Sequence, residues 1–228
     1  MGQAFIEAFE LILSGDRIVW QIIGVTLEMT LISSFVAILI GVPIGAWLGN
    51  ATFRGRRVLV IIDRAFMGLP PVVCGLFCYL LFSGVGPLRG LHLLYTVTGM
   101  VIAQIILLLP MAVGMTESHV FAAAPVINET TRGLKIGKTR SLFLTINESR
   151  YHIISTYLFL WGRAMAEVGA VSIVGGAIMF KTNVMTTAIM NYTSMGNFKS
   201  AMALGIILLF LVFLLNIIGA LLQGDRNK

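Results

Sequence analysis

Charged residues are scarce in this 228-residue chain. Only 11% of its residues are Asp, Glu, Lys or Arg, whereas 57% are hydrophobic, and the mean hydropathy is +0.93. Soluble globular domains carry about 25% charged residues, so the composition excludes a soluble protein. A spanning helix needs about 20 mostly apolar residues, and such runs recur along most of the chain. The sequence therefore predicts an all-α integral membrane protein whose residues 1–228 form a single transmembrane domain.

Cysteine and histidine are also rare. Cys74 and Cys78 lie four residues apart inside an apolar run, and we expect them to act as small hydrophobic residues rather than as a disulfide or a metal pair. His92, His119 and His152 are isolated in the sequence and lack metal-site spacing. We therefore predict no metal, no cofactor and no catalytic residue.

A basic n-region, which a cleavable signal peptide would need, is missing from the N-terminal segment. Residues 4–14 instead place apolar side chains near one helix face with Glu7 and Glu10 opposite, the pattern of an interfacial helix that lies along the membrane. Five spans are predicted to follow, at about 21–49, 57–83, 94–115, 154–178 and 202–222.

Basic residues are distributed unequally between the loops. With five spans, ten Lys and Arg residues fall on one side of the membrane and four on the other. The positive-inside bias then places the N-terminus outside and the C-terminus in the cytoplasm of a multi-pass protein in the cytoplasmic (inner) membrane. The net charge of +6 is accounted for by this topology, so we expect a lipid membrane and not nucleic acid as the partner of these residues.

Two features of the first two spans concern helix packing. Gly41, Gly45 and Gly49 recur at four-residue spacing, which predicts a helix face that another helix approaches closely. Pro70 and Pro71 must kink or interrupt the second span, because neither ring nitrogen can donate a hydrogen bond. The proline pair could line a pathway, form a hinge or be a packing irregularity, and the sequence leaves these alternatives open.

Ionisable residues inside the predicted spans are the next candidates for function. Arg163 and Glu167 are four residues apart in the fourth span, so they can form an ion pair along one helix. Charges at this depth should face the bundle interior. We favour a structural ion pair, shared with Asp63 and Arg64 of the second span; direct contact with an anion in transit is the alternative.

The stretch "GLKIGKT" looks like a nucleotide-binding loop, but its spacing excludes that function. A P-loop needs four residues between its first glycine and the Gly-Lys pair, and only three separate Gly133 from Gly137. We predict instead two short helices, at about 125–135 and 139–149, with Gly137 in the left-handed conformation that ends the first. Such an amphipathic hairpin could rest on lipid headgroups, but its few aromatic residues favour a protein partner.

This segment resembles the cytoplasmic loop of permease subunits of type I ABC importers. Their signature is E-A-A-x-x-x-G, followed some ten residues later by I-x-L-P. Gly137 takes the glycine position and Thr131 the first position, with Glu129 two residues earlier, whereas Ser149 and Arg150 fall on the closing L-P positions. The stretches "GLPPVVCGLFCYLLFSGVGPL" and "GRAMAEVGAVSIVGGAI" are similar to the tungstate-type branch of this family.

The resemblance implies a homodimer of five-span subunits with two cytoplasmic ABC ATPase subunits and an extracytoplasmic substrate-binding protein. The cargo would be an oxyanion, tungstate in the first place, with molybdate, sulfate or vanadate as alternatives, and the partner would hydrolyse ATP. The segment 125–149 would be the coupling loop. Coupling to the ATPase is assigned to Glu129, Thr131, Gly133, Gly137, Lys138, Arg140 and Phe143.

A secondary transporter without ATPase is the rival hypothesis, with Asp63, Arg64, Arg163 and Glu167 as an ion-coupled relay. Such folds tend to be built from internal repeats with interrupted helices in matching positions. The sequence shows no such repeat, and a proline pair occurs only in the second span. We therefore prefer the importer.

Overall fold

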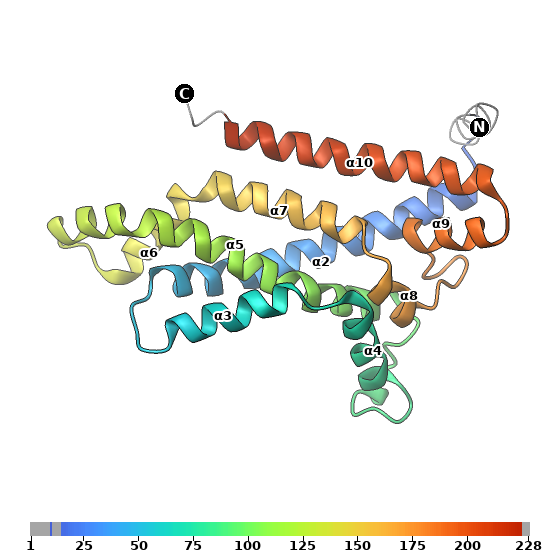
Figure 1. Ribbon diagram of the computed structural model, residues 1–228, viewed down its shortest axis with the longest axis horizontal. Helices are drawn as coiled ribbons and strands as arrows, with labels where there is room; N and C mark the ends of the chain where they lie inside the picture. Colours follow the sequence, from blue (N-terminus) through green and yellow to red (C-terminus); the bar gives the residue numbers. More distant parts are fainter. Residues whose placement is uncertain (1–9, 11–14, 225–228) are drawn as a thin grey trace. The chain divides into compact units, whose positions relative to one another are not determined.

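The computed structural model describes residue 10 and residues 15–224, and these residues form a succession of helices (Figure 1). The helices are α2 (Arg17–Asn50), α3 (Arg56–Met67), α4 (Pro71–Phe82), the 3-10 helix η1 (Arg89–Leu91), α5 (Val97–Gly133), α6 (Lys138–Glu148), α7 (Arg150–Met165), α8 (Gly169–Gly175), α9 (Met185–Ser194) and α10 (Phe198–Gly224). Apart from Glu10, the predicted interfacial helix at 4–14 lies outside the described residues.

Several helices have the length and composition of membrane spans. Three of the described helices, α2, α5 and α10, are long and apolar enough to cross a membrane. The number rises to five if α3 with α4, and α7 with α8, each form one broken span. The predicted all-α class with about five spans is therefore confirmed.

The second span is broken at the proline pair, as predicted. Helix α3 ends at Met67 and α4 begins at Pro71. Pro70 is extended, with φ −62° and ψ 126°, and Pro71 takes the first helical position, where a missing N–H leaves no bond unmade. Further along α4, Cys74 and Cys78 are buried free thiols, as expected of small hydrophobic residues.

The chain divides into two compact units. Unit 1 comprises Met1–Ser33, Pro70–Gln104 and Trp161–Leu215, and unit 2 comprises Ser34–Leu69, Ile105–Leu160 and Asn216–Lys228. In unit 1, a hydrophobic core joins α2, α9 and α10 through Val19, Ile22, Ile23, Met185, Ala188 and Leu204. Close backbone packing joins α4 to α8, because a Cβ at Gly75 would lie 2.7 Å from the Cα of Ala170.

Unit 1 also contains a buried polar cluster. Gln104 on α5 is 1% exposed. Its Oε1 accepts a hydrogen bond from Ser33 Oγ at 2.6 Å, and its Nε2 donates to the carbonyl of Ala164 at 2.7 Å. Nearby, the indole N–H of Trp161 donates to Thr30 Oγ1 at 3.1 Å. Buried polar groups are stable when such partners are present, so these bonds hold α2, α5 and α7 together within the unit.

In unit 2, the glycine face of α2 packs on α5, which confirms the predicted helix packing. A Cβ at Gly41 would overlap Ala112. A Cβ at Gly45 would lie 2.5 Å from the carbonyl oxygen of Val113, and one at Gly49 would lie 2.8 Å from that of Glu117. Small residues at this spacing allow two helix backbones to approach within contact distance.

The predicted short helix at 125–135 is wrong, because these residues are the last turns of α5. That helix runs without interruption from Val97 to Gly133 and contains Pro125. A proline inside a helix removes one hydrogen bond, but the three preceding alanines at 122–124 are the strongest helix formers. The second predicted helix, at 139–149, is confirmed as α6.

The turn between α5 and α6 also differs from the prediction, since Gly137 is not left-handed. Its φ is −65° and its ψ is 153°, and it precedes the first residue of α6. Lys135 takes the left-handed conformation instead, with φ 55°. The N–H of Ile136 donates to the carbonyl of Thr131 at 2.9 Å, and that of Lys135 to Arg132 at 3.1 Å. This is a Schellman motif.

Candidate functional site

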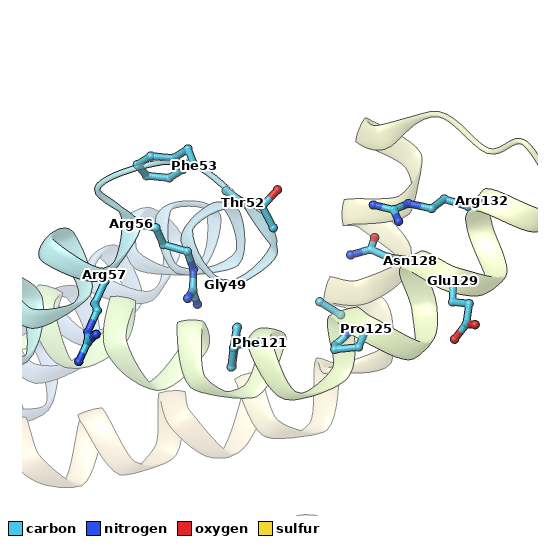
Figure 2. Close-up of a pocket in the computed structure, with 12 residues that line it drawn as sticks. Gly49, Thr52, Phe53, Arg56, Arg57, Phe121, Pro125, Asn128, Glu129 and Arg132 are labelled. Atoms are coloured by element: carbon cyan, nitrogen blue, oxygen red, sulfur yellow. The ribbon is translucent and has the colours of Figure 1, made fainter.

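A cleft opens in unit 2 between the turn that follows α2 and the end of α5 (Figure 2). Its volume is about 880 Å³. The residues that line it are Gly49, Ala51, Thr52, Phe53, Arg56, Arg57, Phe121, Ala124, Pro125, Asn128, Glu129 and Arg132. We call it the basic cleft, because three arginines and a single acidic residue line it.

Arg56 fixes one wall of the basic cleft. Its Nη2 forms an ion pair and hydrogen bond with Glu117 Oε1, and its Nε donates to the carbonyl of Leu48 at 2.7 Å. The guanidinium also lies over the ring of Phe121, 4.3 Å from the centroid. Glu117 is 3% exposed, and a buried carboxylate is stable only when paired. Arg56 therefore ties the turn to α5.

Asp63 and Arg64 were expected to share the charges of the fourth span, but Arg64 has a different partner. Its Nη2 lies 3.6 Å from Glu117 Oε2, and it donates to Ser118 Oγ at 3.5 Å. Asp63 Oδ2 lies 2.7 Å from the position that a Cβ of Gly114 would take, so α3 packs directly on α5. Glu117 was missed because its partners are distant in the sequence.

The predicted pair of Arg163 and Glu167 is confirmed. Arg163 Nη1 donates to Glu167 Oε2 at 2.9 Å, and Glu167 is 4% exposed. The other oxygen, Oε1, accepts from the backbone N–H of Ala170 at 3.3 Å, and the Glu167 carbonyl accepts from Thr186 Oγ1 at 2.8 Å. Glu167 thus satisfies polar groups at the break between α7 and α8.

Thr131, a predicted coupling residue, is buried and does not present a docking surface. Its Oγ1 lies 2.9 Å from Ser141 Oγ on α6. Ser141 Oγ donates to Asn128 Oδ1 at 2.8 Å, and Asn128 Nδ2 donates to Asn50 Oδ1 at 2.6 Å. We call these four residues the α6 clamp, because they join α6 to the ends of α5 and α2. Sequence analysis identified only one of them.

Most other predicted coupling residues are exposed. Phe143 on α6 is 67% exposed, and Leu134 and Val126 are also large apolar residues on the surface. Exposed apolar side chains on a segment that is predicted to lie outside the membrane are available to a protein partner. The predicted coupling residues that share this exposure are Glu129, Gly133, Gly137 and Arg140. The side chain of Lys138 lies outside those described.

Two histidines that are isolated in the sequence meet in unit 2. The rings of His119 on α5 and His152 on α7 stack with their centroids 4.5 Å apart. Among residues 10 and 15–224, no group of three or more His, Cys, Asp or Glu side chains could hold a metal ion. The stacked pair therefore joins two helices.

The fold matches that of a solved ABC importer subunit. A chain in the structure titled "Inward facing conformations of the MetNI methionine ABC transporter" aligns with a TM-score of 0.71, over 91% of this chain and 94% of that one, at 18% identity. The predicted fold is confirmed: the architecture is that of an ABC importer transmembrane domain.

Comparison with known sequences identifies the family to which the chain belongs. The chain is 34% identical to the tungstate uptake system permease protein TupB of Peptoclostridium acidaminophilum, over 99% of each chain. It is 35% identical to a probable anion ABC transporter permease protein of Haloferax volcanii, over 90% of this chain and 92% of that one. No family model matches the chain. The chain belongs to the family of ABC transporter permease proteins that includes these relatives.

Membership in this family confirms several predictions. The chain is a multi-pass protein of the inner membrane, and a separate ATPase subunit and a substrate-binding protein are its partners. ATP is hydrolysed by that separate subunit, so the permease has no nucleotide-binding site of its own. The stretch "GLKIGKT" lacks the spacing of a P-loop, which is consistent with ATP hydrolysis by a separate subunit.

Proposed function

We propose that the chain is the permease of a tungstate importer. The observation that carries this proposal is the similarity to a tungstate uptake permease over nearly the whole length of both chains. Similarity to a probable anion permease over 90% of the chain supports the oxyanion class. Molybdate, sulfate and vanadate, which share the tetrahedral oxyanion shape, are the alternative cargoes.

In the proposed mechanism, two copies of the chain form a homodimer with the anion pathway along its two-fold axis. Two ATPase subunits act on the segment 125–149 from the cytoplasm, and the pathway opens alternately to each side. The broken spans at Pro70–Pro71 and at Glu167 support this mechanism, because interrupted helices within membranes line cavities or hinges. Arg163 would position the break by its ion pair with Glu167.

Coupling is proposed to pass from α6 to α5. Phe143 presents an apolar side chain to the ATPase, since it is 67% exposed on α6. The α6 clamp joins this helix to Asn128, near the end of α5. Because α5 is continuous from Val97 to Gly133, displacement of its end would be carried directly into the membrane-spanning part. In this proposal, Thr131 transmits the displacement of α6 to α5 and does not itself contact the ATPase.

Reconstituted transport tests the proposed function. The permease is placed in vesicles with its ATPase inside and its substrate-binding protein outside, and accumulation of tungstate is measured with and without ATP. We expect ATP-dependent uptake that excess molybdate or sulfate inhibits only weakly. Uptake by the permease alone would establish a secondary transporter, and stronger uptake of another oxyanion would replace the assignment to tungstate.

A further inference from the structure

We propose that the basic cleft is a docking site for an acidic segment of the ATPase partner, next to the coupling segment. This inference rests on the proposed function, in which residues 125–149 face the ATPase. It adds a second element to the contact, the turn after α2 together with the first residues of α3, Arg56 and Arg57. It also states the chemistry of the partner: carboxylate side chains on an ordered segment.

The cleft presents two uncompensated positive charges. Arg56 is balanced by its ion pair with Glu117. Arg57 and Arg132 are exposed, and within the part of the chain that the structure describes neither forms an ion pair. Figure 2 shows Arg132 directed toward the turn and Glu129 directed away from it. Guanidinium groups bind carboxylates through two parallel hydrogen bonds, so this pair selects an acidic ligand.

The walls of the cleft are held in place before any partner binds. On one side, Arg56 is anchored to Leu48 and Glu117. On the other side, the hydrogen bond between Asn128 and Asn50 fixes the end of α5 relative to the end of α2. A site that is ordered in advance loses less entropy on binding. The cleft is therefore suited to receive a rigid segment.

The length of the cleft favours a protein partner over a lipid. Phe121 and Arg132 are the outermost residues of α5 that line it, and they are about 16 Å apart along the helix at 1.5 Å per residue. The headgroup layer of a bilayer is only about 5–8 Å thick on each side. A single phospholipid headgroup is therefore too short to fill the length of the cleft along α5. A helix of about three turns, or about five extended residues, would match its length.

Binding measurements on charge-removing variants test the docking site. The permease is held in nanodiscs of neutral lipid, and its dissociation constant for the ATPase is measured at low and high salt. For the double variant Arg57→Gln/Arg132→Gln, we expect binding about 10-fold weaker at low salt, because each exposed pair contributes about 2- to 5-fold. The difference should largely disappear at about 0.5 M salt, where screening is strong.

Two controls accompany this measurement. Arg54→Gln removes a charge from the same turn, but Arg54 does not line the cleft, so less than about 2-fold weakening is expected. Arg57→Lys/Arg132→Lys keeps the charge but loses the two parallel hydrogen bonds, so its affinity should lie between that of the unmodified permease and that of the double Gln variant. An elution volume equal to that of the unmodified permease shows that each variant is folded.

Two outcomes would overturn the docking site. One is a double variant that binds the ATPase as tightly as the unmodified permease. The other is a double variant that weakens ATPase binding only when the measurement is repeated in nanodiscs with anionic phospholipid, which would assign the cleft to a lipid headgroup. Tungstate uptake by the unmodified complex is measured in parallel. Uptake with unchanged binding of the variant contradicts only the docking site, whereas absence of uptake contradicts the proposed function.

Discussion

Lys135 takes a backbone conformation in which glycine is usual. Its φ of 55° places it at the left-handed position of the Schellman motif that ends α5, where a Cβ is unfavourable by about 1 kcal/mol. The two glycines nearby, Gly133 and Gly137, do not occupy this position. The motif is recognised by its hydrogen bonds and not by the location of glycine in the sequence.

Replacing Lys135 by glycine should stabilise the permease. We expect Lys135→Gly to raise the free energy of unfolding by about 0.5–1 kcal/mol, because glycine adopts positive φ without a steric penalty. Thermal unfolding in detergent measures the change as an increase in Tm. Lys135→Ala is the matched control, since it removes the same charge but keeps the Cβ, and its Tm should not rise. An equal rise in both variants would attribute the effect to charge.

At the scale of elements, the contact between α2 and α5 depends on backbone approach. Gly45 illustrates this, because a Cβ there would lie 2.5 Å from the carbonyl oxygen of Val113 and 2.8 Å from the Cβ of Thr116. Both neighbours are held by the helix backbone and cannot move aside locally. The same helix also contains Gly24, which has no neighbouring atom within 4 Å of its position for a Cβ.

These two glycines form a matched pair for mutation. Gly45→Ala should destabilise unit 2 by about 1–3 kcal/mol, the usual penalty for overpacking. Gly24→Ala should be neutral or slightly stabilising, because alanine favours the helix and meets nothing. The Tm of each variant and the yield of monodisperse protein after detergent extraction report the difference. Similar values for the two variants would contradict the close packing of α2 on α5.

At the scale of the whole molecule, the distribution of basic residues predicts on which side of the membrane each loop lies. The predicted orientation places the segment around Val85 outside and the segment around Phe143 in the cytoplasm. Both side chains are accessible, with exposures of 92% and 67%. The native thiols, Cys74 and Cys78, are buried, so they should contribute little background in a labelling experiment.

Labelling of single introduced cysteines tests this orientation. In intact cells whose outer surface is accessible, a membrane-impermeant maleimide should modify Val85→Cys and leave Phe143→Cys unmodified. After the membrane is permeabilised, both variants should react, because cysteine at either position is exposed to solvent. The reverse pattern would invert the orientation, and with it the assignment of residues 125–149 to the ATPase side.

The correct predictions for the proline pair and for the Arg163–Glu167 ion pair each depend on residues that are close together in the sequence. Pro70 and Pro71 interrupt the second span because of their own covalent structure, and Arg163 pairs with Glu167 because residues four apart face each other on a helix. Two of the incorrect predictions concern Pro125 and Gly137. Pro125 was predicted to begin a helix and Gly137 to end one, because these residue types often do so. The neighbouring residues instead continue α5 through Pro125 and place Lys135 in the left-handed position.

The sequence by itself determined the class of this protein. Apolar runs long enough to cross a bilayer, the biased distribution of basic residues and the small-residue spacing on one helix are all local properties, so they can be recognised without coordinates. The failed P-loop spacing is equally local. Together with the resemblance of several stretches to known permeases, these properties define an importer subunit.

Only the tertiary structure decided which polar residues meet. Arg56 pairs with Glu117, and Asn50 bonds Asn128, although many residues separate the partners in the sequence. Such pairs form because each buried polar group must find a partner in whatever helix packing brings near it. That packing depends on the whole fold. The basic cleft and the α6 clamp are formed by contacts between residues that are distant in the sequence, so no local sequence pattern predicts them.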